Sequence, residues 1–290
     1  MEDHAMMVEW IDRKQLKADV KTLLADAQVS PKAMTALYLA LLLVISLVDE
    51  WAGGGQAVTD RNLLGIFVYV LAALLNAILS AGFVLYCMAV RRGERAEYLT
   101  LFDGFSFVGK IIGLEIVTAI FVSLWSMLFV IPGIIASYRY RFALYNLYEN
   151  PGIGVMEALD MSKRQTAGYK GQLFTLDLSY LGWSLLASVP GIIQIVLLYQ
   201  AVFQALYSGS MSPAMLLQEV ESALLLPLWG RLVISGLWSL TVSLFYVPNY
   251  QCVELGYFET AKRTSGVGED AAPQQDPWNN GMGPDGLGGL

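Results

Sequence analysis

The sequence predicts an all-α fold, a polytopic bundle of transmembrane helices. The chain is 56% hydrophobic and 15% charged, and its mean hydropathy is +0.51, outside the range of ordinary soluble domains. Its apolar residues also gather in runs long enough to cross the roughly 30 Å hydrocarbon layer as helices. We expect a transmembrane domain over residues 33–263 with six spans, at about 33–49, 63–89, 107–130, 131–148, 173–198 and 226–249.

Residues 1–32 are predicted to be a cytoplasmic N-terminal segment that carries an amphipathic helix. Apolar residues recur there with a helical period, while Lys14, Lys17 and Lys21 lie on other faces. Neighbouring acids offset these bases, so we expect a helix lying against the membrane or the bundle rather than a polybasic lipid-binding helix. The segment lacks the pattern of a signal peptide, which predicts that the first span is retained as an anchor.

Residues 107–148 are expected to form a helical hairpin. One continuous helix over this stretch would be about 60 Å long, twice the hydrocarbon thickness. The helix must therefore break, and Pro132-Gly133 is the natural place for the hairpin turn. A hairpin keeps the basic loop around Lys163 on the same side as the basic N-terminus, as the positive-inside rule requires. The consistent solution has six spans and both termini in the cytoplasm.

Five and seven crossings are the alternatives. A single kinked crossing over 107–148 gives five and breaks the positive-inside rule. The segment "WSLLASVPGII" at 183–193 is similar to "WSMLFVIPGII" at 125–135, so Pro190 would mark a further hairpin if the two had the same geometry. That arrangement places the basic end of the transmembrane domain outside, so we expect the fifth span to end in an amphipathic helix at the outer face.

Two elements complete the predicted organisation. Asn150 is a good N-cap with Pro151 at the first helical position, which predicts a short cytoplasmic amphipathic helix at about 151–167. Residues 264–290 are rich in glycine and proline, acidic, and poor in large apolar side chains, so they are predicted to be a disordered tail.

Several of these segments are familiar as a set. The run "IPGIIASYRYRFALYNLYENPGIGVMEALDMSKRQTAGYKGQLFTLDLSYLGW", the later "VPNYQCVELGYFETAKR" and the earlier "IDRKQLKADVKTLL" resemble the bacterial integral-membrane family catalogued as domain of unknown function 975. The resemblance covers most of residues 8–263, with Pro-Gly-Ile-Ile, Asn-Pro, Ser162-Lys163 and Gly182-Trp183 in order. It implies a six-span fold and an address in the bacterial cytoplasmic membrane. The family has no agreed activity, so the resemblance implies no catalytic residues.

Ionisable residues inside the predicted spans are the best functional leads, since each costs about 2.5–3.5 kcal/mol at a helix centre. In the six-span arrangement an intramembrane polar cluster is expected in the inner half of the membrane, with the arginines of the fourth span pairing with acids of the third and fifth: Glu115, Arg139, Arg141 and Asp177. The structural interpretation is that these pairs hold helices together or that Arg141 snorkels to the headgroups. The functional one is a crevice for an ion, a proton, a small solute or a lipid headgroup.

Other function classes lack the residues they need. The single histidine, His4, lies near the N-terminus, which leaves a nucleophile in the membrane without a base. Two isolated cysteines and no phosphate-binding loop argue against metal sites and cofactors, and no basic patch supports nucleic acid binding. We therefore expect a non-enzymatic membrane scaffold or assembly-associated protein, with the lipid bilayer and a membrane or cytoplasmic protein as partners. The alternative is a transporter or channel-like protein that uses the polar cluster. The sequence identifies neither substrate nor oligomeric state.

Overall fold

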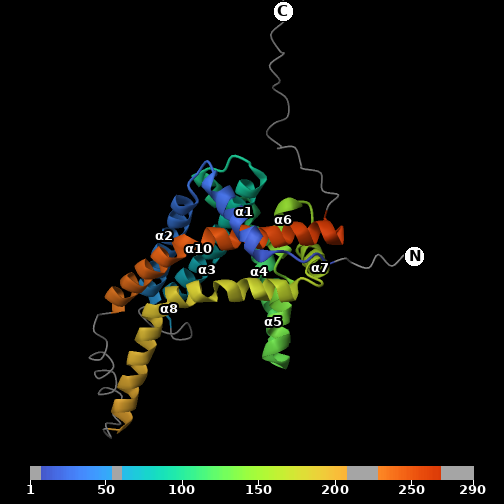
Figure 1. Cartoon of the computed structure of the whole chain (residues 1–290). Helices are drawn as coiled ribbons and strands as arrows, with labels where there is room; N and C mark the ends of the chain where they lie inside the picture. The colour runs from blue at the N-terminus through green and yellow to red at the C-terminus, as the bar shows by residue number, and fades with distance from the viewer. Residues whose placement is uncertain (1–7, 54–60, 208–227, 269–290) are drawn as a thin grey trace, which may run out of the picture. The chain divides into compact units, whose positions relative to one another are not determined.

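The computed structural model describes residues 8–53, 61–207 and 228–268, and regular structure in this part of the chain is entirely helical (Figure 1). In chain order the elements are α1 (Arg13–Ala25), α2 (Pro31–Gly53), α3 (Leu63–Arg92), the 3₁₀ helix η2 (Tyr98–Phe107), α4 (Val108–Leu128), α5 (Val130–Arg139), α6 (Ala143–Glu149), α7 (Val155–Gln165), α8 (Lys170–Tyr207) and α10 (Leu228–Ser265). Residues 269–290 of the predicted tail and the beginning of the predicted sixth span lie outside the described residues.

Five helical segments in the described part of the chain are long and apolar enough to cross a membrane. They are Pro31–Gly53, Leu63–Arg92, Tyr98–Leu128, Lys170–Gln204 and Gly230–Ser265. The protein is thus an all-α, polytopic membrane protein, as the composition predicts. The expected fourth span, 131–148, is absent from this set because the chain there is divided between α5 and α6, which have 10 and 7 residues.

The chain forms two compact units. The first contains residues up to Trp10, residues 116–170 and residues from Phe258 onward, and the second contains residues 11–115 and 171–257. The units are not a division of the sequence into halves, because α4 and α10 each contribute residues to both.

In the second unit, α3 packs against η2 so closely that glycine is required on both sides. A Cβ atom at Gly82 would lie 1.9 Å from the carbonyl oxygen of Leu101, and one at Gly104 would lie 2.4 Å from the carbonyl oxygen of Ile78. The largest wholly buried side chain of α3 nearby is Tyr86, whose hydroxyl donates to the Val29 carbonyl at 3.0 Å. This close backbone approach fixes the end of α3 without polar side chains.

The amphipathic α1 lies lengthwise along the beginning of α8. Ile11 N–H donates to Gln172 Oε1 at 3.1 Å, and Lys17 Nζ donates to Ser179 Oγ at 2.8 Å. Asp12 caps α1 by accepting from the first N–H groups of the helix. Both α8 and α10 contain an internal proline, Pro190 and Pro248, and both change direction along their length (Figure 1), as expected where a proline removes a helical hydrogen bond.

In the first unit, α5 turns back against the end of α4 at Phe129. This residue has extended backbone angles, φ −162° and ψ 155°, and a Cβ atom at Gly133 would lie 2.0 Å from Ser126 Oγ. The break precedes the predicted turn at Pro132-Gly133 by three residues. Pro132 is instead the third residue of α5, where its missing N–H costs nothing because the first N–H groups of a helix have no partner.

The amphipathic helix α7 begins four residues later than predicted, at Val155, with Gly154 as its N-cap. Asn150 does not cap it, because this residue ends α6 and its carbonyl accepts from Ile153 N–H at 3.1 Å in a turn. One face of α7 is buried in the first unit, at Ala158, Leu159, Met161, Ser162 and Gln165. Burial of polar side chains on that face leads to the site described next.

Candidate functional site

The four residues of the predicted polar cluster divide between the two units. Arg139 and Arg141 belong to the first unit, and Glu115 and Asp177 belong to the second. Within its own unit Glu115 is exposed, whereas Asp177 is half-buried and accepts a hydrogen bond from Tyr250 Oη at 2.7 Å. The pairing of arginines with acids therefore stays a prediction, and each unit offers its own polar arrangement instead.

Arg139 and Arg141 flank the break between α5 and α6, and α7 completes the hydrogen bonds that this break leaves open. The wholly buried Ser162 Oγ donates to the Arg139 carbonyl at 2.9 Å and accepts from Phe142 N–H at 3.0 Å. Thr166 Oγ1 donates to the same carbonyl at 3.3 Å. The guanidinium of Arg141 lies 5.4 Å from the ring centre of Tyr138. One serine thus satisfies both backbone groups freed by the interruption of the helix.

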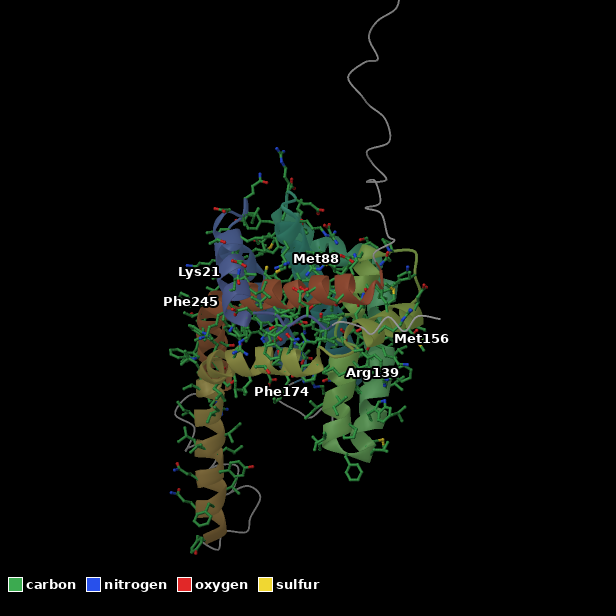
Figure 2. All side chains as sticks on the ribbon, turned by 45° about the vertical axis from the view of Figure 1, so that its right-hand side comes forward. Lys21, Met88, Arg139, Met156, Phe174 and Phe245 are labelled. Carbon is green, nitrogen blue, oxygen red and sulfur yellow. The ribbon has the colours of Figure 1, made fainter. Side chains whose placement is uncertain are left out.

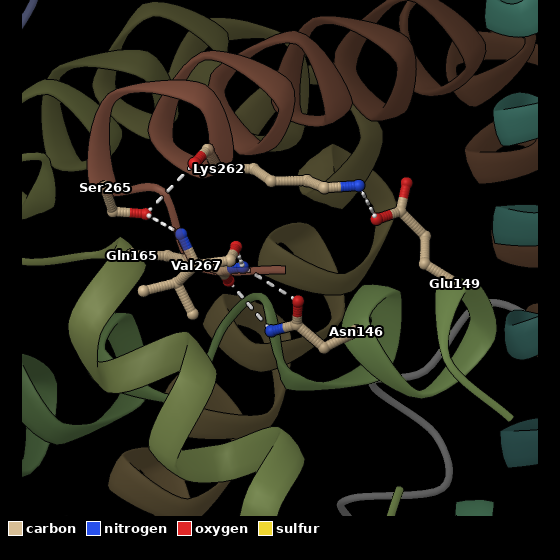
Figure 3. A network of polar contacts seen from close by, with 6 residues as sticks. All are labelled: Asn146, Glu149, Gln165, Lys262, Ser265 and Val267. Atoms are coloured by element: carbon tan, nitrogen blue, oxygen red, sulfur yellow. Dashed lines mark hydrogen bonds and ion pairs between the residues drawn. The ribbon is translucent and has the colours of Figure 1, made fainter. Parts of the chain in front are cut away.

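A reciprocal amide pair lies beside this break (Figure 3). Asn146 Nδ2 donates to Gln165 Oε1 at 2.8 Å, and Gln165 Nε2 donates back to Asn146 Oδ1 at 2.9 Å. Gln165 Nε2 also donates to the Val267 carbonyl at 3.1 Å, just beyond α10. Both side chains are wholly buried. Buried amides stabilise a fold only when their donors and acceptors are paired, so this network joins α6, α7 and the end of α10.

Two ion pairs made by neighbouring residues of α10 differ in burial. Lys262 Nζ lies 2.6 Å from Glu149 Oε2, and these side chains are 21% and 12% exposed. Arg263 Nη2 lies 2.7 Å from Glu9 Oε2, with exposures of 65% and 51%. The first pair borders the amide network in Figure 3 and is shielded from water, so it contributes more to stability than the second.

The second unit has an aromatic pairing between α8 and α10 around Asp177. Besides the Tyr250 hydroxyl on Asp177, the Tyr180 hydroxyl donates to Asn249 Oδ1, and the rings of Tyr180 and Tyr250 meet edge to face at 5.2 Å. Trp183 stacks on Tyr246 with ring centres 6.1 Å apart. Asp177 is thus held within a structural contact of two helices.

Two cavities follow the same three helices of the second unit, α2, α8 and α10. One, of about 930 Å³, is bordered by the end of α1, the first residues of α2, and residues 180–183 and 244–249. The other, of about 810 Å³, lies further along α2, where its polar lining includes Asp49, Glu50, Asn76, Ser188, Ser235 and Ser239. Between them, Trp238 Nε1 donates to the Leu186 carbonyl at 2.8 Å and ties α10 to α8.

Sequence reasoning did not find the amide pair or the lysine-lined cavity. Asn146 and Gln165 are uncharged, and a search for charges in apolar runs passes over them. Ser162 was noted only as part of the family resemblance. Groups of three or more His, Cys, Asp or Glu side chains arranged to hold a metal ion do not occur among the described residues.

Comparison with protein families gives one match. Residues 127–214 match the model of the family described as "Protein of unknown function (DUF975)". The resemblance to that family is confirmed over this segment. The segment contains Pro132-Gly133, the α5–α6 break and its partner Ser162, so the DUF975 region of this chain carries the best-defined polar structure of the first unit. No curated protein and no solved structure matches.

Proposed function

We propose that this protein is a non-enzymatic membrane scaffold in the cytoplasmic membrane of a bacterium, with both termini in the cytoplasm. The distribution of lysine and arginine supports this orientation, and the DUF975 match supports the family assignment. The role of the scaffold is to present α7 to a protein partner at the cytoplasmic surface.

The observation that carries the proposal is the way α7 is held. Its buried face is fixed by Ser162 and Gln165, so it is anchored in protein rather than floating on lipid. Its opposite face is charged and exposed, with Asp160 at 3.9 Å from Lys163 and 3.8 Å from Arg164. These contacts are long and solvent-exposed, and such pairs contribute about 0–1 kcal/mol. The charges are thus free to pair with a partner at low cost.

Site-specific photocrosslinking in native membranes tests the scaffold role. A crosslinking residue replacing Glu157, on the exposed face, is expected to give discrete protein adducts, and one replacing the buried Ala158 is expected to give none. The adducts should disappear when Lys163→Glu and Arg164→Glu reverse the local charge. Adducts that survive this reversal, or that form equally from the exposed Gln15 on α1, would contradict a specific docking face on α7.

A transporter or channel-like role is the second candidate, favoured by the two cavities along α2, α8 and α10. In this role the contact between Trp238 and Leu186 would separate an outer chamber from an inner one. The test is solute and ion flux in proteoliposomes carrying Cys87→Ala, Cys252→Ala and Ser239→Cys. Flux that is blocked by a water-soluble thiol reagent at position 239, and not at a control Ser137→Cys, would favour transport. Absence of flux above protein-free liposomes would leave the scaffold role alone.

A further inference from the structure

The cavity of about 930 Å³ in the second unit has a basic mouth that the rest of the structure does not neutralise. Lys17 and Lys21 come from α1, and Lys32 comes from the first turn of α2. None of the three forms an ion pair with the described residues, and none of the described residues that line the cavity is acidic. Three cations in one cavity without a carboxylate constitute a charge complement for an anion.

Two of the ammonium groups lie against aromatic rings instead of acids. Lys17 Nζ lies 3.7 Å from the ring centre of Tyr180 and Lys32 Nζ lies 5.7 Å from that of Phe245. Figure 2 labels Lys21 on α1 and Phe245 on the neighbouring α10, and both line the cavity. Cation–π contacts hold the side chains in place without neutralising their charge. Burial, and then the charge of Arg13, lower the pKa of Lys17 from its usual value of 10.5, as expected for an ammonium that lacks a counter-ion.

The start of α2 adds donors to the same place. Met34 N–H makes the first helical hydrogen bond, to the Ser30 carbonyl at 3.0 Å, so the N–H groups of Lys32 and Ala33 precede the helical ladder. Ser30, Pro31 and Lys32 all border the cavity. The N-terminus of a helix favours anions through these N–H groups and through its dipole, which strengthens the attraction of the three lysines.

The opposite wall of the cavity is apolar and belongs to helices that are long enough to cross the membrane. Leu244, Phe245, Tyr246 and Trp183 supply this wall from α10 and α8, and Phe245 is 60% exposed. A ligand that satisfies both walls carries an anionic group and a hydrocarbon chain on one molecule. A free phosphate ion would satisfy the lysines but leave the aromatic wall uncovered.

We propose that this cavity binds one anionic phospholipid, with its phosphate among Lys17, Lys21 and Lys32 and an acyl chain along Phe245 and Trp183. The site differs from a polybasic helix face, because the lysines come from two helices and converge on a bounded cavity with aromatic walls. It stands apart from the scaffold role of α7, since its residues belong to the other unit.

Native mass spectrometry of the delipidated full-length protein tests this site, with phosphatidylglycerol and phosphatidylcholine of the same acyl chains as probes. We expect one phosphatidylglycerol to be retained in preference to phosphatidylcholine, and Lys21→Gln with Lys32→Gln to weaken its binding about thirtyfold. The matched control is Lys14→Gln with Lys163→Gln, which removes the same charge at exposed positions outside the cavity and should leave binding unchanged.

Three outcomes would overturn the proposal. Equal weakening by the two double variants would mean that only the total charge matters. Equal retention of phosphatidylcholine would mean that the phosphate charge pattern is not read. Displacement of the lipid by inorganic phosphate at an equal concentration would identify a site for a free anion. Lys17 is left intact because its hydrogen bond to Ser179 also holds α1 on α8, so loss of binding in the double variant is separable from loss of folding.

Discussion

The amide network of the first unit and the lysine-lined cavity of the second use polar side chains in opposite ways. In the first, Asn146 and Gln165 are wholly buried and each satisfies the other. In the second, Lys21 and Lys32 are exposed at a cavity mouth and form no ion pair with the described residues. Paired polar groups add stability and specificity to a fold, whereas unpaired cations beside an apolar wall favour a ligand.

The difference teaches that charge alone is a poor guide to function in this chain. Asp177 is an acid in an apolar run, yet it serves a contact between α8 and α10 through Tyr250. The lysines of α1 are common surface residues by composition, but the fold brings two of them to the same cavity as Lys32. What distinguishes the two regions is whether the folded chain supplies a partner.

The largest expected effect lies in the closely packed part of the second unit. Gly82→Ala would place a Cβ atom 1.9 Å from the Leu101 carbonyl oxygen, so α3 and η2 must separate, at a cost of about 1–3 kcal/mol or more. Thermal unfolding in detergent should show a large fall in midpoint. Gly109→Ala is the matched control, since a Cβ atom there meets nothing within 4 Å, and it should be stabilising by roughly 0.5–1 kcal/mol. Equal effects of the two changes would refute the close approach.

The amide pair gives the next effect. Gln165→Leu leaves the buried Asn146 amide without its partner, which is expected to cost about 1–3 kcal/mol. Adding Asn146→Leu removes the stranded group, so the double variant should be less destabilised than the sum of the single ones. A double-mutant cycle on unfolding midpoints measures this coupling. Simple additivity would show that the two amides do not depend on each other.

The two ion pairs of α10 provide a smaller and graded contrast. Lys262→Met breaks the shielded pair with Glu149 and should cost about 1–2 kcal/mol, between the values typical of surface and buried pairs. Arg263→Met breaks the exposed pair with Glu9 and should cost at most about 0.5 kcal/mol, with a contribution that salt removes. Unfolding curves at low and high salt compare them. The reverse order would show that the exposures of 21% and 65% do not govern the two contributions.

The smallest change in intrinsic stability is expected for the cavity. Lys21→Gln with Lys32→Gln removes exposed charges that the fold does not use, so the lipid-free protein should unfold within about 0.5 kcal/mol of the unaltered chain. Circular dichroism during heating checks this. A large loss of stability without lipid would show that the lysines serve the fold and would remove the contrast between the two regions.

The sequence predicts the membrane class and most of the long helices, because hydropathy and length determine them directly. It also predicts a break in 107–148, but not its form. Hydropathy treats 131–148 as one span, whereas the chain bends at residues 140–142, where Ser162 of a later helix satisfies the freed backbone groups. A bond between residues 20 apart leaves no mark in local periodicity. Pro132 is compatible both with a turn and with the first turn of a helix, so the exact position of the turn was not determined.

The polar sites were hidden for the same reason. Lys17 and Lys21 are visible on the polar side of a predicted helix, but the aromatic wall opposite them comes from residues more than 150 positions later, such as Tyr180 at 3.7 Å from Lys17 Nζ. Asn146 and Gln165 meet only because α6 and α7 fold against each other. Sequence patterns report the face of a helix, and tertiary packing decides what that face meets.

The most direct test of the contrast is the rise in unfolding temperature caused by phosphatidylglycerol, relative to phosphatidylcholine, in three proteins: the unaltered chain, Gln165→Leu, and Lys21→Gln with Lys32→Gln. A ligand that binds the folded state raises its stability by mass action. The account predicts the same rise in the unaltered chain and in Gln165→Leu, although the latter starts from a lower midpoint, and no rise in the lysine variant. A full rise in the lysine variant, or its loss in Gln165→Leu, would contradict the division between a structural network and a ligand-binding cavity.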